Sequence, residues 1–169
     1  TANTMATVAE AIGLALPYSC GAPAPYEIRD TFCFTAGEKV MELLARNIRP
    51  RDIVTRKALE NAATVVAASG GSTNAALHLP AIAHEAGISF DLFDVAEIFR
   101  RTPYIADLKP GGRYVAKDLL EVGGIPLLKA LGAGAVDIGF VGAAPPTAAL
   151  HGGRRDRLVV ATTLWADVG

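Results

Sequence analysis

The spacing of apolar residues predicts that the chain begins with a helix. Between Met5 and Leu16 the apolar residues recur at steps of three and four, which places them on one face of a helix. Asn3 or Thr4 is a suitable N-cap, and Pro17 is expected to end the run. The first element is therefore predicted to be an amphipathic helix of about three turns.

A second helix is expected over residues 26–47, after a loop rich in Pro and Gly at residues 17–25. Its charged residues Glu38, Lys39, Glu42 and Arg46 fall outside the predicted apolar face. That face consists of Ile28, Phe32, Ala36, Val40, Leu43 and Leu44. The pattern predicts that this face packs on the core.

Two further helices follow a turn at residues 49–52. Thr55 can cap a helix that ends at the glycine pair 70–71, where glycine adopts the left-handed conformation common at helix ends. The next helix extends through Glu85 to Gly87, and Pro80 inside it predicts a kink or two short helices.

The remaining periodic segments are shorter. Residues 88–90 are a candidate strand, Asp91 can cap a helix over residues 92–101, and residues 115–129 are expected to be helical with a break at the glycine pair 123–124. Because the chain contains few strand candidates, the pattern favours a helix-rich α/β class in which this chain supplies a helical layer.

The last forty residues differ in character. Residues 130–169 contain 9 Ala and 7 Gly, and the helical periodicity fades there. The interpretation divides the chain into a domain segment, residues 1–129, and an Ala/Gly-rich tail, residues 130–169, that does not continue it.

Composition and charge exclude several classes of partner. The net charge is −1, and the run Arg154, Arg155 and Arg157 is short enough to be only solvated, so no nucleic-acid partner is expected. No apolar run approaches the roughly 20 residues that span a bilayer, and no secretion signal opens the chain, so a cytoplasmic protein without a membrane partner is expected. Cys20 and Cys33 are predicted to be reduced, semi-buried thiols without zinc-ligand companions.

The best candidate for chemistry is the segment Gly-Gly-Ser-Thr-Asn at residues 70–74. Glycines let the backbone approach a ligand, and the N–H groups at a helix start favour an anion, so Ser72, Thr73 and Asn74 are candidate substrate-binding residues. The same residues are also those needed for a helix end followed by an N-cap, and both interpretations stay open.

Other polar groups predict little. His78 and His84 are six residues apart and do not share a helix face as neighbours, and Asp91 and Asp94 are explained by capping. Residues 111–113, Gly-Gly-Arg, could hold a phosphate, although a solvent-exposed turn needs the same residues.

Several segments together carry a resemblance. Residues 1–6 (Thr-Ala-Asn-Thr-Met-Ala), 53–55, 60–62, 70–79 and 107–112 resemble, in the same order, segments of the dihydroxy-acid dehydratase and phosphogluconate dehydratase family. The resemblance covers about residues 1–129, and the segments are far more specific in combination than a single glycine pattern. Residues 130–169 do not match, and either an out-of-frame reading or a foreign, non-native terminus would explain them.

The resemblance implies a fold and an activity for a longer parent enzyme. The fold would be a three-layer α/β/α N-terminal domain of which this chain is a fragment. The activity would be removal of water from a 2,3-dihydroxy carboxylate to give a 2-keto acid in valine and isoleucine biosynthesis. The implied cofactors are an iron–sulfur cluster, acting as a Lewis acid, and Mg²⁺, and the implied assembly is a homodimer.

The resemblance also implies what this chain lacks. The family's cluster cysteines, Mg²⁺ ligands and catalytic base match no residue here, so the fragment is expected to bind neither cofactor and to be inactive alone. Residues 1–4 would form a wall beside the cluster, and Ser72, Thr73 and Asn74 would face the same substrate cavity. Two alternatives stay open: a fragment of a sugar-acid dehydratase acting on gluconate, arabinonate or 6-phosphogluconate, and a non-enzymatic helical binding domain.

Overall fold

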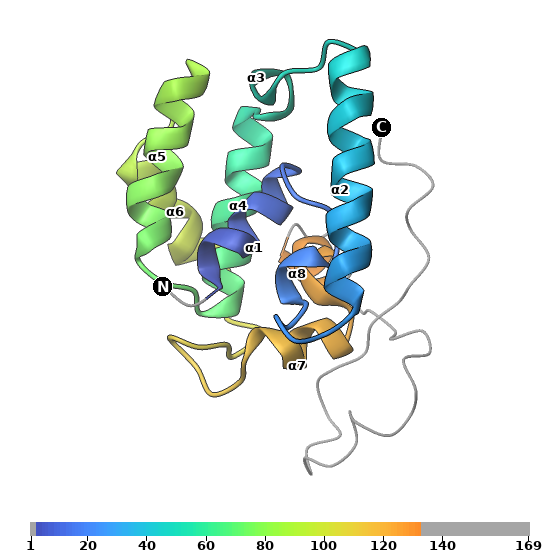
Figure 1. The fold of residues 1–169 in the computed structure, drawn as a ribbon. Coiled ribbons are helices and arrows are strands. Elements are labelled where there is room, and N and C mark those ends of the chain that lie inside the picture. Colours follow the sequence, from blue (N-terminus) through green and yellow to red (C-terminus); the bar gives the residue numbers. More distant parts are fainter. Residues whose placement is uncertain (1–2, 133–169) are drawn as a thin grey trace.

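The computed structural model describes residues 3–132, and this part of the chain is helical (Figure 1). In chain order, the helices are α1 (Thr4–Ile12), the 3₁₀ helix η1 (Ser19–Gly21), α2 (Ile28–Ala45), α3 (Pro50–Ile53), α4 (Arg56–Ser69), α5 (Asn74–Ala86), α6 (Leu92–Arg101), α7 (Ala116–Glu121) and α8 (Gly124–Gly132). The predicted helix-rich class is confirmed. Within residues 3–132 no helix is long and apolar enough to cross a membrane.

No sheet occurs among residues 3–132, where the β-type pairing is an isolated bridge between Leu108 and Tyr114. The described residues therefore do not supply the sheet of a three-layer arrangement. The predicted strand at residues 88–90 is wrong. Ile88 donates its N–H to the carbonyl of Ala83 as α5 ends, and Phe90 is buried against the helical core with the Arg56 guanidinium over its ring.

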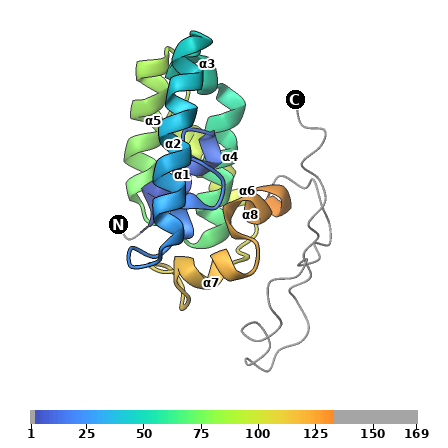
Figure 2. The same cartoon turned by 45° about the vertical axis from the view of Figure 1, so that its right-hand side comes forward.

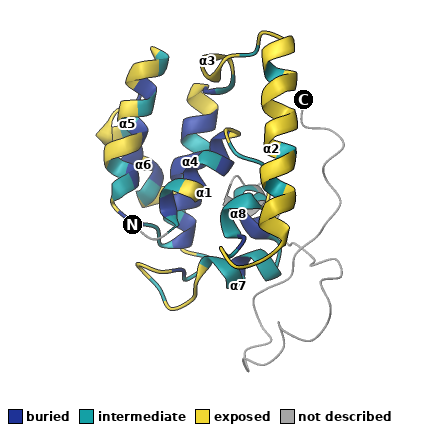
Figure 3. Ribbon diagram, in the orientation of Figure 1, coloured by how far each residue is buried: buried dark blue, intermediate teal, exposed yellow. Residues whose placement is uncertain are grey.

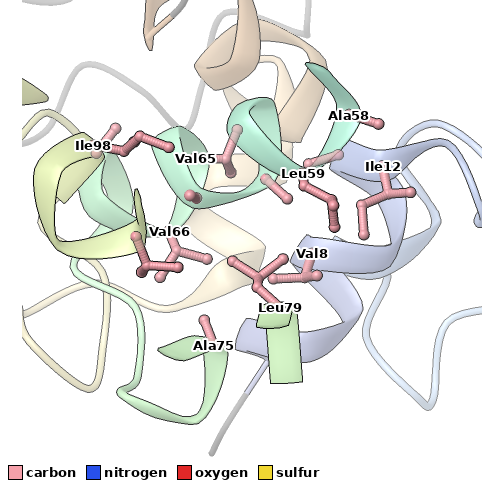
Figure 4. Close-up of a cluster of buried hydrophobic side chains, with 14 of the residues drawn as sticks. Val8, Ile12, Ala58, Leu59, Val65, Val66, Ala75, Leu79 and Ile98 are labelled. Atoms are coloured by element: carbon pink, nitrogen blue, oxygen red, sulfur yellow. The ribbon is translucent and has the colours of Figure 1, made fainter. Parts of the chain in front are cut away.

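Helix α4 lies at the centre of the core and packs against α1, α5, α6 and α8 (Figure 1). Its five alanines favour helix formation and, being small, allow neighbouring helices to approach closely. Its buried residues are Ala58, Leu59, Ala62, Ala63, Val65, Val66, Ala68 and Ser69. Figure 4 shows Leu59 facing Val8 and Ile12 of α1, with Val66 close to Leu79 of α5. Helix α4 is therefore the central helix of the core, because α1, α5, α6 and α8 all pack against it.

Local capping sets the ends of α4 and α6 as the sequence predicts. The Thr55 hydroxyl accepts the N–H of Ala58 at 3.1 Å, so α4 begins where expected. The Asp91 carboxylate accepts the N–H groups of Phe93 and Asp94, and the Asp94 carboxylate accepts the N–H of Asp91 at 2.9 Å. The predicted break between α7 and α8 at the glycine pair 123–124 is also confirmed.

Three predicted boundaries differ in the structure. Helix α1 ends at Ile12 because Gly13 adopts a left-handed conformation and the N–H groups of Gly13 and Leu14 bond back to Ala9, so the helix does not reach Pro17. Residues 50–52, predicted from the sequence to lie in a turn, belong to the one-turn helix α3, and Arg49 is its N-cap. Helix α5 is one helix that includes Pro80, so of the two predicted alternatives, a kink or two short helices, the division into two helices is wrong.

The prediction for α2 fails in its packing. The helix forms close to the predicted limits, but none of its residues is buried. Figures 1 and 2 show α2 lying along one side of the other helices, and Figure 3 shows it mostly exposed. Its apolar residues are distributed around the helix and not gathered on one face, so no single stripe is directed at the core.

Candidate functional site

Three segments that are distant in the sequence meet around residues 70–74. Ser72 donates its N–H to the Thr4 hydroxyl at 3.0 Å, which ties the α4–α5 connection to the start of α1. Gly111 donates its N–H to the Gly70 carbonyl at 2.9 Å, which ties the same connection to the loop after α6. Figure 1 shows these three segments gathered at one end of the helices. The fold therefore unites residues 3–6, 70–74 and 107–112, three of the segments that carry the family resemblance.

The predicted site residues occupy different environments. Ser72 is buried, and its hydroxyl accepts the N–H of Asn74 at 3.3 Å at the start of α5. Thr73 is exposed and Asn74 is half-buried. The N-cap of α5 is Thr73, whose side chain makes no capping bond, and the Ser72 hydroxyl supports the helix start from the position before it. The Thr73 and Asn74 side chains are the more accessible of the three. Their role in binding substrate stays a prediction.

The start of α5 uses several of its backbone donors internally. The N–H of Asn74 bonds the Ser72 hydroxyl, that of Ala75 bonds the Ser72 carbonyl at 3.2 Å, and that of Ala76 bonds the Thr73 carbonyl at 3.0 Å. Such N–H groups lack helical partners at a helix start and otherwise turn to solvent or ligand. A carboxylate approaching this end would therefore meet the helix dipole and the exposed side chains more readily than a row of free N–H groups.

Gly70 permits close contact between the α4–α5 connection and the loop after α6. Its φ is +74°, and a Cβ added there would lie 2.7 Å from the Tyr104 ring and 3.1 Å from the Leu108 carbonyl oxygen. A Cβ at Gly111 would lie 2.7 Å from the Gly70 carbonyl oxygen. The two backbones can approach this closely because neither residue carries a side chain.

Asp107 holds the loop after α6 in its turn. Its carboxylate accepts the Tyr104 hydroxyl at 2.8 Å and the Arg113 Nε at 2.5 Å. The bond from the Arg113 guanidinium, with that from Tyr104, lowers the pKa of the Asp107 carboxyl below its usual range. Because Arg113 is occupied in this pair, the turn interpretation of residues 111–113 is favoured over a phosphate site. Sequence reasoning did not single out Tyr104 or Asp107, whose pairing depends on the turn.

A buried carboxylate organises the loop that follows α1. Glu10 is buried, and its two carboxylate oxygens accept the N–H groups of Tyr18 at 2.7 Å and Cys20 at 3.0 Å. The Asn3 side-chain amide donates to the carbonyl of Cys20, which closes the loop onto the start of α1. The predicted irregular loop is therefore fixed by α1 itself.

The two cysteines lie in unlike surroundings. Cys20 is half-buried, and burial together with the neighbouring Glu10 carboxylate raises the pKa of its thiol. Cys33 is exposed on α2, so the prediction that it is semi-buried is wrong. The raised pKa favours the protonated thiol in this environment.

The described residues do not fit the implied cofactors. Among residues 3–132, no group of three His, Cys, Asp or Glu side chains is placed so that it could hold a metal ion. An iron–sulfur cluster needs several thiolates, and Mg²⁺ needs convergent oxygen ligands. His78 and His84 are both exposed on α5. We assign no step of a reaction through either cofactor to this part of the chain.

An open groove of about 720 Å³ lies elsewhere, between α1, α3 and α5. Its walls are mostly apolar, and its charged or titratable side chains are Arg51, His78 and Glu85. Ser72, Thr73 and Asn74 do not line it. This groove on the described surface is therefore separate from the predicted site.

Known proteins are similar to this chain over the region that contains these three segments. The sequence model of the family described as "Dihydroxy-acid/6-phosphogluconate dehydratase N-terminal" matches residues 1–137. The chain is 88% identical over 128 residues to "Dihydroxy-acid dehydratase 2" of Bradyrhizobium diazoefficiens and 84% identical over 128 residues to the protein of the same name from Mesorhizobium japonicum. It is 73% identical over 128 residues to "Dihydroxy-acid dehydratase" of Pelagibacter ubique. Each match covers 76% of this chain, which spans 22% of the length of each relative.

Proposed function

This chain belongs to the dihydroxy-acid and 6-phosphogluconate dehydratase family, and from that premise we propose that it is part of a dihydroxy-acid dehydratase. The parent enzyme would remove water from a 2,3-dihydroxy-3-methyl carboxylate and release a 2-keto acid for valine and isoleucine biosynthesis. The observation that carries the proposal is the high identity to several relatives bearing that name. A cytoplasmic homodimer that acts on a small molecule fits this biosynthetic role.

Within the parent, the chain would contribute a helical scaffold and one edge of the substrate cavity. Thr4, Ser72 and Gly111 lie in segments joined by two hydrogen bonds, one from the Ser72 N–H to the Thr4 hydroxyl and one between the backbones of Gly111 and Gly70, so a substrate reaching one segment is near the others. The exposed Thr73 and half-buried Asn74 side chains can donate or accept hydrogen bonds to a hydroxy acid. The iron–sulfur cluster and Mg²⁺ implied for the parent would be bound by residues outside 3–132. The proposed domain segment comprises residues 1–129, and the proposed tail, residues 130–169, lies almost wholly outside the described residues.

The proposal is tested by comparing the chain with the enzyme encoded by the intact parent gene. After anaerobic iron–sulfur reconstitution with Mg²⁺, the parent is expected to convert 2,3-dihydroxyisovalerate to its keto acid. The 169-residue chain treated in the same way is expected to match a blank without protein. Turnover of gluconate or 6-phosphogluconate alone by the parent would favour the sugar-acid alternative. Turnover of no hydroxy acid would favour a helical binding domain.

Side-chain substitutions test the predicted site in the parent. Ser72→Gly costs only a few tenths of a kcal/mol in capping, because glycine is a tolerated N-cap. If residues 72–74 touch substrate, Ser72→Gly and Asn74→Ala are expected to raise KM or lower kcat about tenfold, the effect of losing one hydrogen bond to a charged group. Steady-state kinetics measure this difference.

Thr55→Gly is the matched control for these substitutions. Thr55 caps α4 at the end remote from Gly70, so its loss weakens a helix start without altering the predicted site. Its kinetic constants are expected to stay within about twofold of the parent's, because cap removal acts on stability. Equal kinetic constants in all three variants would show that residues 72–74 have a structural role and do not contact the substrate.

A further inference from the structure

The loop between α6 and α7 closes the carboxyl end of α4 (Figure 1). Four of its backbone N–H groups donate to the last two carbonyls of α4 and to the carbonyl that follows them. These bonds, at 2.8–2.9 Å, run from Ile105 and Ala106 to Ala68, from Leu108 to Ser69 and from Gly111 to Gly70. The last carbonyls of an α-helix have no partner within the helix, so a segment that supplies N–H groups there fixes how the chain leaves the helix. The chain leaves α4 directly into residues 70–74, the segment that contains the predicted substrate-binding residues.

Asp107 holds this loop closed at its base. Its carbonyl accepts the N–H groups of Arg113 and Tyr114 at 2.8 and 3.0 Å. Its carboxylate accepts the Tyr104 hydroxyl on one arm of the loop and the Arg113 Nε on the other. The Asp107 backbone has φ +49°, a left-handed conformation that Asp and Asn adopt more readily than most residues. A Cβ added to Gly112 would overlap the Asp107 carbonyl group, so the two arms lie in close contact.

Residues 70–72 are held on two sides. The loop bonds them at Gly70, and the Thr4 hydroxyl accepts the N–H of Ser72 at 3.0 Å. Thr4 belongs to α1, which packs directly against α4, so this second contact remains when the loop loosens. A loosened loop therefore shifts residues 72–74 without releasing them, and a moderate effect on substrate binding is expected.

From these contacts we propose that Asp107 is a positioning residue for the binding of substrate at residues 72–74. Asp107 fixes the loop, the loop fixes the end of α4, and the end of α4 sets how residues 72–74 enter α5. The role is indirect, because both carboxylate oxygens are already bonded to Tyr104 and Arg113. The inference rests on the proposed function, since it adds a residue to the site that would bind the hydroxy acid.

Asp107→Asn in the reconstituted parent enzyme tests the role. Asparagine keeps a side-chain oxygen for the Tyr104 hydroxyl and accepts the left-handed conformation, but it loses the charge that pairs with Arg113. We expect kcat/KM to fall about fivefold, the upper range for an exposed ion pair. The change is expected in the same constant, KM or kcat, that Asn74→Ala changes. Steady-state kinetics with the hydroxy acid that the parent dehydrates measure both constants.

The double variant Asp107→Asn/Asn74→Ala separates positioning from a general loss of stability. If Asp107 acts by placing the Asn74 side chain, its effect is expected to shrink to within about twofold once that side chain is absent. A residue that acts only through the stability of the whole chain keeps its full effect in the double variant. Full multiplication of the two single effects would therefore overturn the proposal.

Substitutions of Arg113 test the pair from its second member. The Arg113 side chain is 77% exposed, so its replacement leaves the core intact. Arg113→Met is expected to lower kcat/KM as Asp107→Asn does, because it removes the same charge pair. Arg113→Lys keeps a positive charge and N–H donors, and it is expected to restore most of the loss. Equal losses with Met and Lys would contradict a role for the charge pair.

Asp94→Asn is the matched control. Asp94 pairs with Arg56 at 2.7 Å, so the same substitution removes an ion pair that joins α6 to the first turn of α4, the end remote from Gly70. We expect kcat/KM to stay within about twofold of the parent's, because an exposed pair away from the site contributes little. An equal loss in both Asp→Asn variants would show a nonspecific effect of ion-pair removal and would overturn the proposal.

Hydrogen exchange in the parent tests the mechanical link without substrate. Amides of residues 70–76 and 105–111 are expected to exchange faster in Asp107→Asn and at the unaltered rate in Asp94→Asn. Unchanged exchange in Asp107→Asn would overturn the proposal. Faster exchange with unchanged kinetic constants in an active parent would overturn the positioning role alone. A parent that dehydrates no hydroxy acid would overturn the proposed function and this role together.

Discussion

Replacing Leu59 by alanine is expected to lower the free energy of unfolding by about 2–5 kcal/mol. Leu59 is fully buried on α4, the helix that packs against four others, and Figure 4 shows its side chain facing α1. Removing its three terminal carbons loses burial and leaves a cavity that a tightly packed core fills poorly. Urea unfolding followed by circular dichroism measures the change.

Leu77→Ala provides the control for this prediction. Leu77 is 72% exposed on α5, so the same chemical change removes little buried surface there. Its cost is expected to stay within about 0.5 kcal/mol. Similar losses in both variants would show that α4 is not the centre of the stable structure.

The second large effect is expected at Gly70. Gly70→Ala forces a residue with a side chain into a left-handed conformation, at about 1–2 kcal/mol, and pushes its Cβ against Tyr104 and the Leu108 carbonyl. Crowding of this kind adds about 1–3 kcal/mol. The sum is expected to destabilise the chain by about 2–5 kcal/mol and to displace the loop after α6, as urea unfolding and proteolysis at residues 104–114 would report.

Gly87→Ala separates the two contributions to this loss. Gly87 ends α5 with φ +73°, nearly that of Gly70, but a Cβ there meets no atom within 4 Å. Its cost is therefore expected to be the conformational part alone, about 1–2 kcal/mol. Adding Tyr104→Ala to Gly70→Ala should recover part of the excess, since it removes the ring that blocks the Cβ. Equal losses at Gly70 and Gly87 would contradict the close contact between the two loops.

Part of the candidate site could be predicted from the sequence. The glycine pair at residues 70–71 and the polar residues after it indicate both a helix end and a helix start, and the structure has both there. The partners of this segment could not be predicted from spacing. The bond from Ser72 to Thr4 joins residues 68 positions apart, and the contact of Gly70 with Gly111 depends on how the loop after α6 folds back.

The sequence by itself determined the helices whose ends are capped by residues close to them in the sequence. Thr55 and Asp91 bond N–H groups within three residues, and Gly70 and Gly87 turn the chain by their own conformation, so these signals act before any packing. Only the tertiary structure decided which apolar faces are covered. Helix α2 has as many large apolar residues as a core helix, yet α4 occupies the centre because its alanines let four helices approach it at once. Burial depends on the fit of whole elements to one another, and no spacing within a single helix specifies that fit.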